Sequence, residues 1–123
     1  MYNTIIVPTD FSDEASTIRS LKQAEKLSGN NRIIFLHVLE AIPYLVTKTR
    51  ETMDEWLKNS GVEAAIEIRH DGSSYHNIIE SAKENEADLI LIRSHKPGLK
   101  DYLLGSTASK VVRHAPCSVL VDR

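Results

Sequence analysis

The chain has 123 residues, of which 41% are hydrophobic and 26% charged, and its formal net charge is −2. This length and composition predict one folded globular domain over residues 1–123 rather than a disordered chain. A net charge so near zero provides no field that would attract nucleic acid or an anionic membrane, so we expect neither partner. The chain opens without a basic-then-apolar leader, and no apolar run approaches the roughly 20 residues of a membrane span. The single cysteine, Cys117, excludes an intrachain disulfide framework and favours the cytoplasm.

Residues that interrupt regular structure predict the boundaries of the first elements. Pro8 ends a β-branched strand, because proline cannot donate to a strand ladder. Ser12 is a suitable N-cap for the helix that follows, and Gly29 is typical of a residue that ends one. Pro43 suits the first turn of the second helix.

Hydrophobic patterning predicts how deeply the strands are buried. Residues 33–39 are almost continuously apolar, which is typical of a strand covered on both faces. Residues 62–69 alternate imperfectly between apolar and polar side chains, which predicts an edge strand with one wetter face. The pattern as a whole predicts strands at residues 2–7, 33–39, 62–69, 89–92 and 118–121, and helices at residues 13–28, 43–60, 74–86 and 106–114.

Strict alternation of strands and helices predicts an α/β fold, an open five-stranded parallel sheet with helices on both faces and right-handed crossovers. Such sheets bind their ligands at the carboxyl edge. Two segments are expected to meet there: the end of the fourth strand at Arg93 and Ser94, and the helix start at Gly105-Ser106-Thr107. Because a helix start presents free backbone N–H groups, this arrangement predicts an anion or nucleotide site.

With these elements in place, the chain resembles the universal stress protein family along its whole length. The fragments that carry the resemblance are Ile5-Ile6-Val7-Pro8-Thr9-Asp10-Phe11-Ser12, Leu36-His37-Val38, Ala87-Asp88-Leu89-Ile90, Ser94-His95, Gly105-Ser106-Thr107-Ala108 and Ala115-Pro116-Cys117-Ser118-Val119-Leu120-Val121. The resemblance implies a Rossmann-like sheet of strand order 3-2-1-4-5. It also implies a non-catalytic stress-response homodimer, paired through the last strand at Val119, Leu120 and Val121.

The resemblance further implies a site for an adenine nucleotide, ATP or AMP, with Mg²⁺. ATP-binding members carry Gly-x-x-Gly, nine residues, and then Gly-Ser or Gly-Thr. Here the matching positions hold Arg93, Lys96 and, after eight residues, Gly105-Ser106. Asp10 is expected at the ribose hydroxyls, and the backbone of Val38 beside the adenine. The full set of candidate contacts is Pro8, Thr9, Asp10, Val38, Arg93, Ser94, His95, Lys96, Gly105, Ser106 and Thr107.

Each of these residues also has an interpretation that needs no ligand. Arg93 and Lys96 are cations that could contact phosphate, or they are solvated loop charges. Asp10 could be a turn residue, and Ser106 and Thr107 could be helix caps. Val38 could be an ordinary buried strand residue.

Two other functions remain open at this point. The same fold could be a protein-interaction dimer that binds no nucleotide. A phosphoacceptor receiver domain, with Asp10, Asp71 and Ser94 near strand ends, is less favoured because receivers need paired acids after strand one and Lys-Pro after strand five. We expect no catalytic residues and no metal site, since the five histidines show no ligand spacing with a cysteine or carboxylate.

Overall fold

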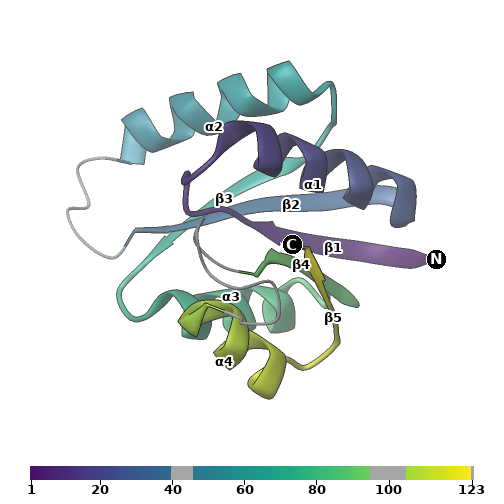
Figure 1. Ribbon diagram of the computed structural model, residues 1–123, viewed down its shortest axis with the longest axis vertical. Helices are drawn as coiled ribbons and strands as arrows, with labels where there is room; N and C mark the ends of the chain where they lie inside the picture. Colours follow the sequence, from purple (N-terminus) through teal and green to yellow (C-terminus); the bar gives the residue numbers. More distant parts are fainter. Residues whose placement is uncertain (40–45, 95–104, 123) are drawn as a thin grey trace.

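The computed structural model describes residues 1–39, 46–94 and 105–122. Strands and helices alternate along the chain, as the sequence pattern predicts (Figure 1). The elements are β1 (Tyr2–Pro8), α1 (Glu14–Leu27), β2 (Ser28–Leu39), α2 (Val46–Ser60), β3 (Ala65–His70), α3 (Ser74–Glu84), β4 (Leu89–Arg93), α4 (Ser106–His114) and β5 (Ser118–Asp122).

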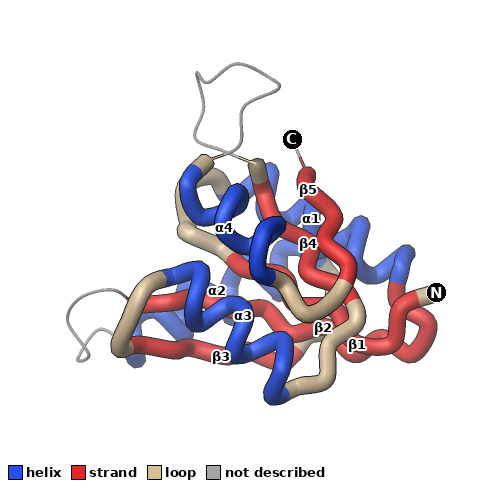
Figure 2. Tube along the Cα trace, turned by 90° about the horizontal axis from the view of Figure 1, so that it is seen from below, coloured by secondary structure: helices blue, strands red, loops and turns tan. Residues whose placement is uncertain are grey.

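The five strands form one parallel sheet of order β3-β2-β1-β4-β5, which confirms the expected order. Figure 1 shows α1 and α2 on one face of the sheet and α3 and α4 on the other. In Figure 2 the helices α3 and α4 lie next to each other over the same face. β3 is an edge strand and is half-buried over most of its length, as the alternation over 62–69 predicts.

The two faces of the sheet carry separate hydrophobic clusters, because side chains alternate along each strand. In β4, Leu89 and Leu91 belong to the cluster under α1 and α2, which also contains Met53 and Trp56 of α2. Ile90 and Ile92 belong to the cluster under α3 and α4. The face on which a β4 side chain lies therefore follows directly from its position in the strand.

The ends of α1 differ from the prediction. The N-cap is Asp13 rather than Ser12, and its carboxylate accepts hydrogen bonds from the backbone N–H and the hydroxyl of Ser16. α1 ends at Leu27, and β2 begins at Ser28 in register with Tyr2 of β1, so Gly29 lies in the strand instead of ending the helix. Pairing with β1 therefore draws these residues into the sheet. Pro43, predicted in the first turn of the second helix, lies outside the described residues.

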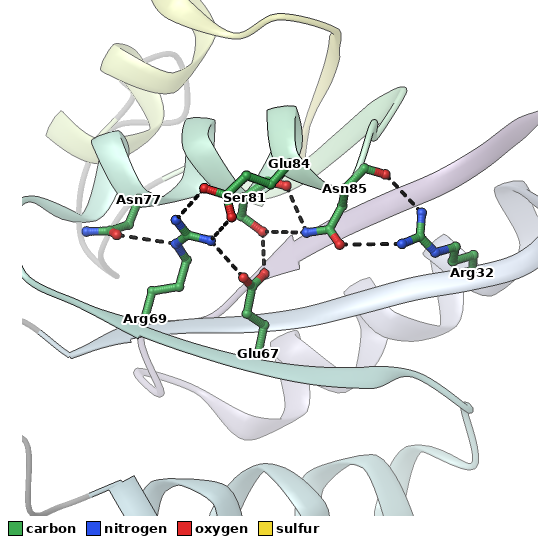
Figure 3. A network of polar contacts seen from close by, with 7 residues as sticks. All are labelled: Arg32, Glu67, Arg69, Asn77, Ser81, Glu84 and Asn85. Carbon is green, nitrogen blue, oxygen red and sulfur yellow. Dashed lines mark hydrogen bonds and ion pairs between the residues drawn. The ribbon is translucent and has the colours of Figure 1, made fainter.

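A polar network joins the edge strand β3 to α3 (Figure 3). The Arg69 guanidinium donates to Glu67 at 2.8 Å and to both carboxylate oxygens of Glu84 at 3.1 Å. The second carboxylate oxygen of Glu67 accepts from the Ser81 hydroxyl, and Asn77 accepts from Arg69 Nε at 3.3 Å. The network attaches α3 to β3, which is at the edge of the described sheet and pairs there with β2.

Within the described residues, none of the helices is both long and apolar enough to cross a membrane.

Candidate functional site

A cavity of about 170 Å³ lies at the carboxyl edge of the sheet, where β1, β2 and β4 end and α3 and α4 begin. This is the edge at which open α/β sheets bind their ligands. The described residues that line it are Pro8, Thr9, Asp10, Ser12, Leu36, Val38, Ser74, Ile78, Ile92, Arg93, Ser94, Gly105, Ser106, Thr107 and Ala108.

The candidate residues that the structure describes all line this one cavity, although they come from four separate segments of the chain. They are Pro8, Thr9, Asp10, Val38, Arg93, Ser94, Gly105, Ser106 and Thr107. His95 and Lys96 lie outside the described residues.

Sequence reasoning missed a further group of lining residues: Ser12, Leu36, Ser74, Ile78, Ile92 and Ala108. Most of them have ordinary core side chains, and no sequence pattern separates a core residue from a cavity wall. Ser74 could have been found, because it opens α3 directly after the N-cap Ser73. The argument that selected Ser106 at the start of α4 applies equally to it.

The start of α4 lines the cavity, and the residue at its N-cap position carries no side chain that could cap the helix. Its N-cap is Gly105, which makes no side-chain capping hydrogen bond, and the Gly105 N–H donates to the Ser94 carbonyl. Ser106 and Thr107 therefore occupy the first helical positions, and neither of them is the N-cap of α4. Backbone N–H groups in the first turn of a helix have no intrahelical acceptor and suit an anion.

The turn from Thr9 to Ser12 forms another part of the rim. The Phe11 N–H donates to the Thr9 hydroxyl at 3.1 Å, and the Ser12 N–H donates to one carboxylate oxygen of Asp10 at 2.9 Å. Asp10 is thus a turn residue, as one interpretation predicted. A carboxylate has acceptor sites on two oxygens, so the exposed Asp10 retains capacity to accept from a ligand.

Arg93 occupies the position at which the sequence resemblance implies a glycine, and its backbone conformation requires no glycine. The described non-glycine residues with positive φ are Phe11, Asp71 and Glu86, so Arg93 is not strained. Strand alternation places the Arg93 side chain on the Leu91 face, under α1, whereas Ile92 and Ser94 line the cavity from the opposite face. The side chain of Arg93 therefore extends to the α1 side of the sheet and does not occupy the cavity.

The electrostatics of α1 agree with that placement. The pKa of Asp13 is lowered, chiefly because its carboxylate accepts the Ser16 hydroxyl, and in part because of the positive charge of Arg93. In the β4–β5 register Arg93 lies beside Asp122. Arg93 Nη1 is buried and has no hydrogen-bond partner among the described residues. That Arg93 contacts phosphate remains a prediction. The orientation of its side chain toward α1 does not favour such a contact.

The cavity combines an apolar wall with hydroxyl groups. Leu36, Val38 and Ile78 form an apolar surface from β2 and α3, while Ser106 and Thr107 present hydroxyls at the start of α4. This division suits a ligand with a flat apolar part and a polar or anionic end. Among the described lining residues Asp10 is the one carboxylate, and in the described part of the chain no three His, Cys, Asp or Glu residues gather as a metal site.

Asp71, the possible phosphoacceptor, lies elsewhere. It follows β3, is exposed with φ 68°, and its carboxylate contacts His70 Nδ1 at 3.0 Å. It is not among the described residues that line the cavity. The acidic residues Asp10 and Asp71 therefore do not form the shared acidic site of a receiver domain.

The family model of the universal stress protein family matches residues 1–123. Universal stress protein G of Salmonella typhimurium is 30% identical to this chain. The alignment has 143 positions, gaps included, and covers 100% of both chains. Two solved structures share the fold. A universal stress protein from Archaeoglobus fulgidus in complex with dAMP has a TM-score of 0.73 at 22% identity, covering 99% of this chain and 98% of that one. A universal stress protein in complex with cAMP has a TM-score of 0.74 at 24% identity, covering 99% and 97%. This chain therefore belongs to the universal stress protein family.

Proposed function

We propose that this protein is a non-catalytic, cytoplasmic stress-response dimer that binds an adenine nucleotide, ATP or AMP, in the cavity at the carboxyl edge of the sheet. The observation that carries the proposal is the convergence of Asp10, Val38 and the uncapped start of α4 on one cavity. Two family members with the same fold are solved in complex with dAMP and cAMP, which supports an adenine nucleotide as the ligand.

Each part of a nucleotide has a matching part of the cavity. The apolar wall of Val38 and Ile78 suits the adenine ring, and the carboxylate of Asp10 suits the ribose hydroxyls. The N–H groups and hydroxyls of Ser106 and Thr107 suit a phosphate. Because the described cavity contains one carboxylate and no nucleophile with an adjacent base, we expect binding without turnover.

The size of the cavity makes AMP the first ligand to test. Pockets that enclose drug-sized ligands span about 300–1,000 Å³, whereas this one has about 170 Å³. The described walls therefore enclose less space than such a pocket. AMP has two phosphates fewer than ATP and is the smaller of the two candidate ligands.

The dimer is proposed to pair through the outer edge of β5. Val119, Leu120 and Val121 are half-buried and lie in an edge strand of the described sheet. An apolar edge strand is prone to pair with another strand, and a second copy of β5 is a suitable partner. The alternative is that this dimer interacts with proteins and binds no nucleotide, and the small volume of the cavity is the observation that favours it.

Calorimetric titration of nucleotide-stripped protein with AMP, and with ATP and Mg²⁺, tests the ligand. We expect saturable binding to the wild type and loss of it in the double variant Asp10→Ala, Ser106→Ala. The double variant Thr47→Ala, Asp54→Ala is a matched control, because it removes the same groups from exposed positions on α2. No binding up to millimolar nucleotide would contradict the proposal and favour the interaction dimer.

A sharper variant is Ser106→Pro. Proline is tolerated at the first helical position, so α4 should stay intact while one N–H group and one hydroxyl leave the site. Hydrogen bonds to charged groups contribute about 1.5–3 kcal/mol, so we expect the nucleotide affinity to fall by roughly 10- to 100-fold. Binding at wild-type affinity would mean that the start of α4 does not hold the phosphate.

A further inference from the structure

The turn that carries Asp10 is held from behind by a side chain that does not line the cavity. His37 Nδ1 lies 2.7 Å from the carbonyl oxygen of Thr9, immediately before Asp10. A carbonyl oxygen only accepts hydrogen bonds, so this contact requires the imidazole proton on Nδ1. His37 therefore donates to the backbone of the turn.

A contact between aromatic rings holds the same turn at Phe11, the residue after Asp10. The Phe11 ring centroid lies 4.4 Å from that of His37, and the Phe11 ring meets Trp56 edge-on at 5.1 Å. Phe11 has φ 62°, in the left-handed region that a bulky side chain rarely adopts. An unfavourable backbone conformation persists where surrounding contacts hold it, and here the contacts are those with His37 and Trp56.

The position of His37 in β2 explains how it acts on the cavity without entering it. Leu36 and Val38 point to the α3 and α4 face, where they line the cavity. His37 lies between them and so points to the α1 and α2 face, where Phe35 and Trp56 are buried. One strand thus forms the apolar wall of the cavity with one face and holds the Asp10 turn with the other.

We infer that His37 is a positioning residue, which fixes the turn so that the Asp10 carboxylate meets the ribose hydroxyls of a bound nucleotide. The inference rests on the proposed function and deepens it, because it makes selectivity for an intact ribose depend on a residue outside the cavity. It separates two effects: the affinity for phosphate and base depends on α4 and the apolar wall, and the affinity for the ribose hydroxyls depends on His37.

Titrations with AMP and with 2′,3′-dideoxy-AMP separate these effects. We expect the wild type to prefer AMP by about tenfold or more, since each hydroxyl donates to a charged carboxylate. His37→Leu removes the N–H donor and should lose that preference while its affinity for dideoxy-AMP stays within about twofold. His37→Asn places an amide N–H near the position of Nδ1–H and should restore most of the preference.

Two controls distinguish positioning from general destabilisation. Leu57→Ala shortens a half-buried side chain that packs on the same hydrophobic cluster, and it should leave the preference for AMP unchanged. Adding His37→Leu to Asp10→Asn should cause no further loss of preference, because both changes act through one carboxylate. A His37→Leu variant that still prefers AMP as the wild type does would overturn the inference.

A measurement without ligand tests the positioning separately from the proposed function. We expect the amide hydrogens of Phe11 and Ser12 to exchange at least tenfold faster in His37→Leu than in the wild type, and near the wild-type rate in His37→Asn. If the wild type binds neither nucleotide, the proposed function is wrong. Equal exchange in the wild type and His37→Leu would then show that His37 does not hold the turn.

Discussion

The two edge strands of the sheet differ in how their side chains are satisfied. β3 carries Glu67 and Arg69, whose charged groups are joined to each other and to Glu84 of α3 (Figure 3). β5 instead presents Val119, Leu120 and Val121, half-buried and apolar. Charged side chains on an edge strand discourage pairing with another chain, whereas an apolar edge invites it. The comparison agrees with the proposed pairing of β5 with a second copy and makes β3 the less suitable edge for it.

Arg69, near the end of β3, and Arg93, at the end of β4, also differ in how well their hydrogen-bond donors are satisfied. Arg69 donates to Glu67, Asn77 and Glu84, and the Glu84 contact raises its pKa. Arg93 has a buried Nη1 for which the described part of the chain supplies no hydrogen-bond partner. A paired charge stabilises the fold, while a buried donor without an acceptor costs free energy. The network between β3 and α3 thus stabilises the fold. Arg93, at the end of β4, instead retains a hydrogen-bond donor that no described residue uses.

The largest expected effect comes from placing a charge on each edge in turn. Val119→Lys should convert the proposed dimer to a monomer, because an antiparallel pairing of β5 with its copy would bring like charges close together. Ile66→Lys makes the same change on β3 and should leave the dimer intact. Light scattering measures both. A Val119→Lys protein that remains dimeric would exclude pairing through β5.

Removing the two arginines should have effects of different size. Arg69→Met leaves Glu67 and Glu84 without their cation, and we expect the free energy of unfolding to fall by about 1–2 kcal/mol. Arg93→Met removes a buried donor that has no partner among the described residues, but it also removes the positive charge that lowers the pKa of Asp13, so we expect a smaller loss than for Arg69→Met. Urea denaturation gives both values, with the exposed Arg50→Met on α2 as a control. A larger loss for Arg93→Met than for Arg69→Met would reverse the comparison.

The smallest effect is a dependence of stability on pH. The hydrogen bond from Arg69 lowers the pKa of Glu84 below its usual 4.5. A carboxyl group with a lowered pKa in the folded state stabilises the protein above its unfolded pKa, and this contribution disappears as the pH falls through the folded pKa. Glu84 is exposed, so the contribution is small and screened by salt.

Urea denaturation at pH 6 and pH 3 checks this dependence. Wild-type stability should fall more between the two pH values than that of Glu84→Gln, and Glu55→Gln on α2 should behave as the wild type. Equal pH dependence in the wild type and Glu84→Gln would mean that the ion pair with Arg69 contributes nothing to folding.

The order of the elements and the location of the site could be predicted from the sequence because both depend on local patterns. Alternating strands and helices require a parallel sheet, and a parallel sheet brings its carboxyl ends to one edge. Thr9, Asp10 and Ser106 could therefore be selected as neighbours although they lie far apart in the chain. The boundary at Ser12 was wrong because Ser12 and Asp13 are both suitable N-caps, and the turn geometry decides between them.

The sequence by itself determined the fold class, the edge position of residues 62–69 and the candidate residues of the cavity. Tertiary structure alone decided on which side of the sheet each candidate acts. Arg93 lies under α1 because side chains alternate along β4, and His37 meets Thr9 because β1 and β2 are neighbours in register. The contact between His37 and Thr9 joins residues 28 positions apart, and no local propensity encodes it. It follows from the strand pairing, which forms only when the whole sheet assembles.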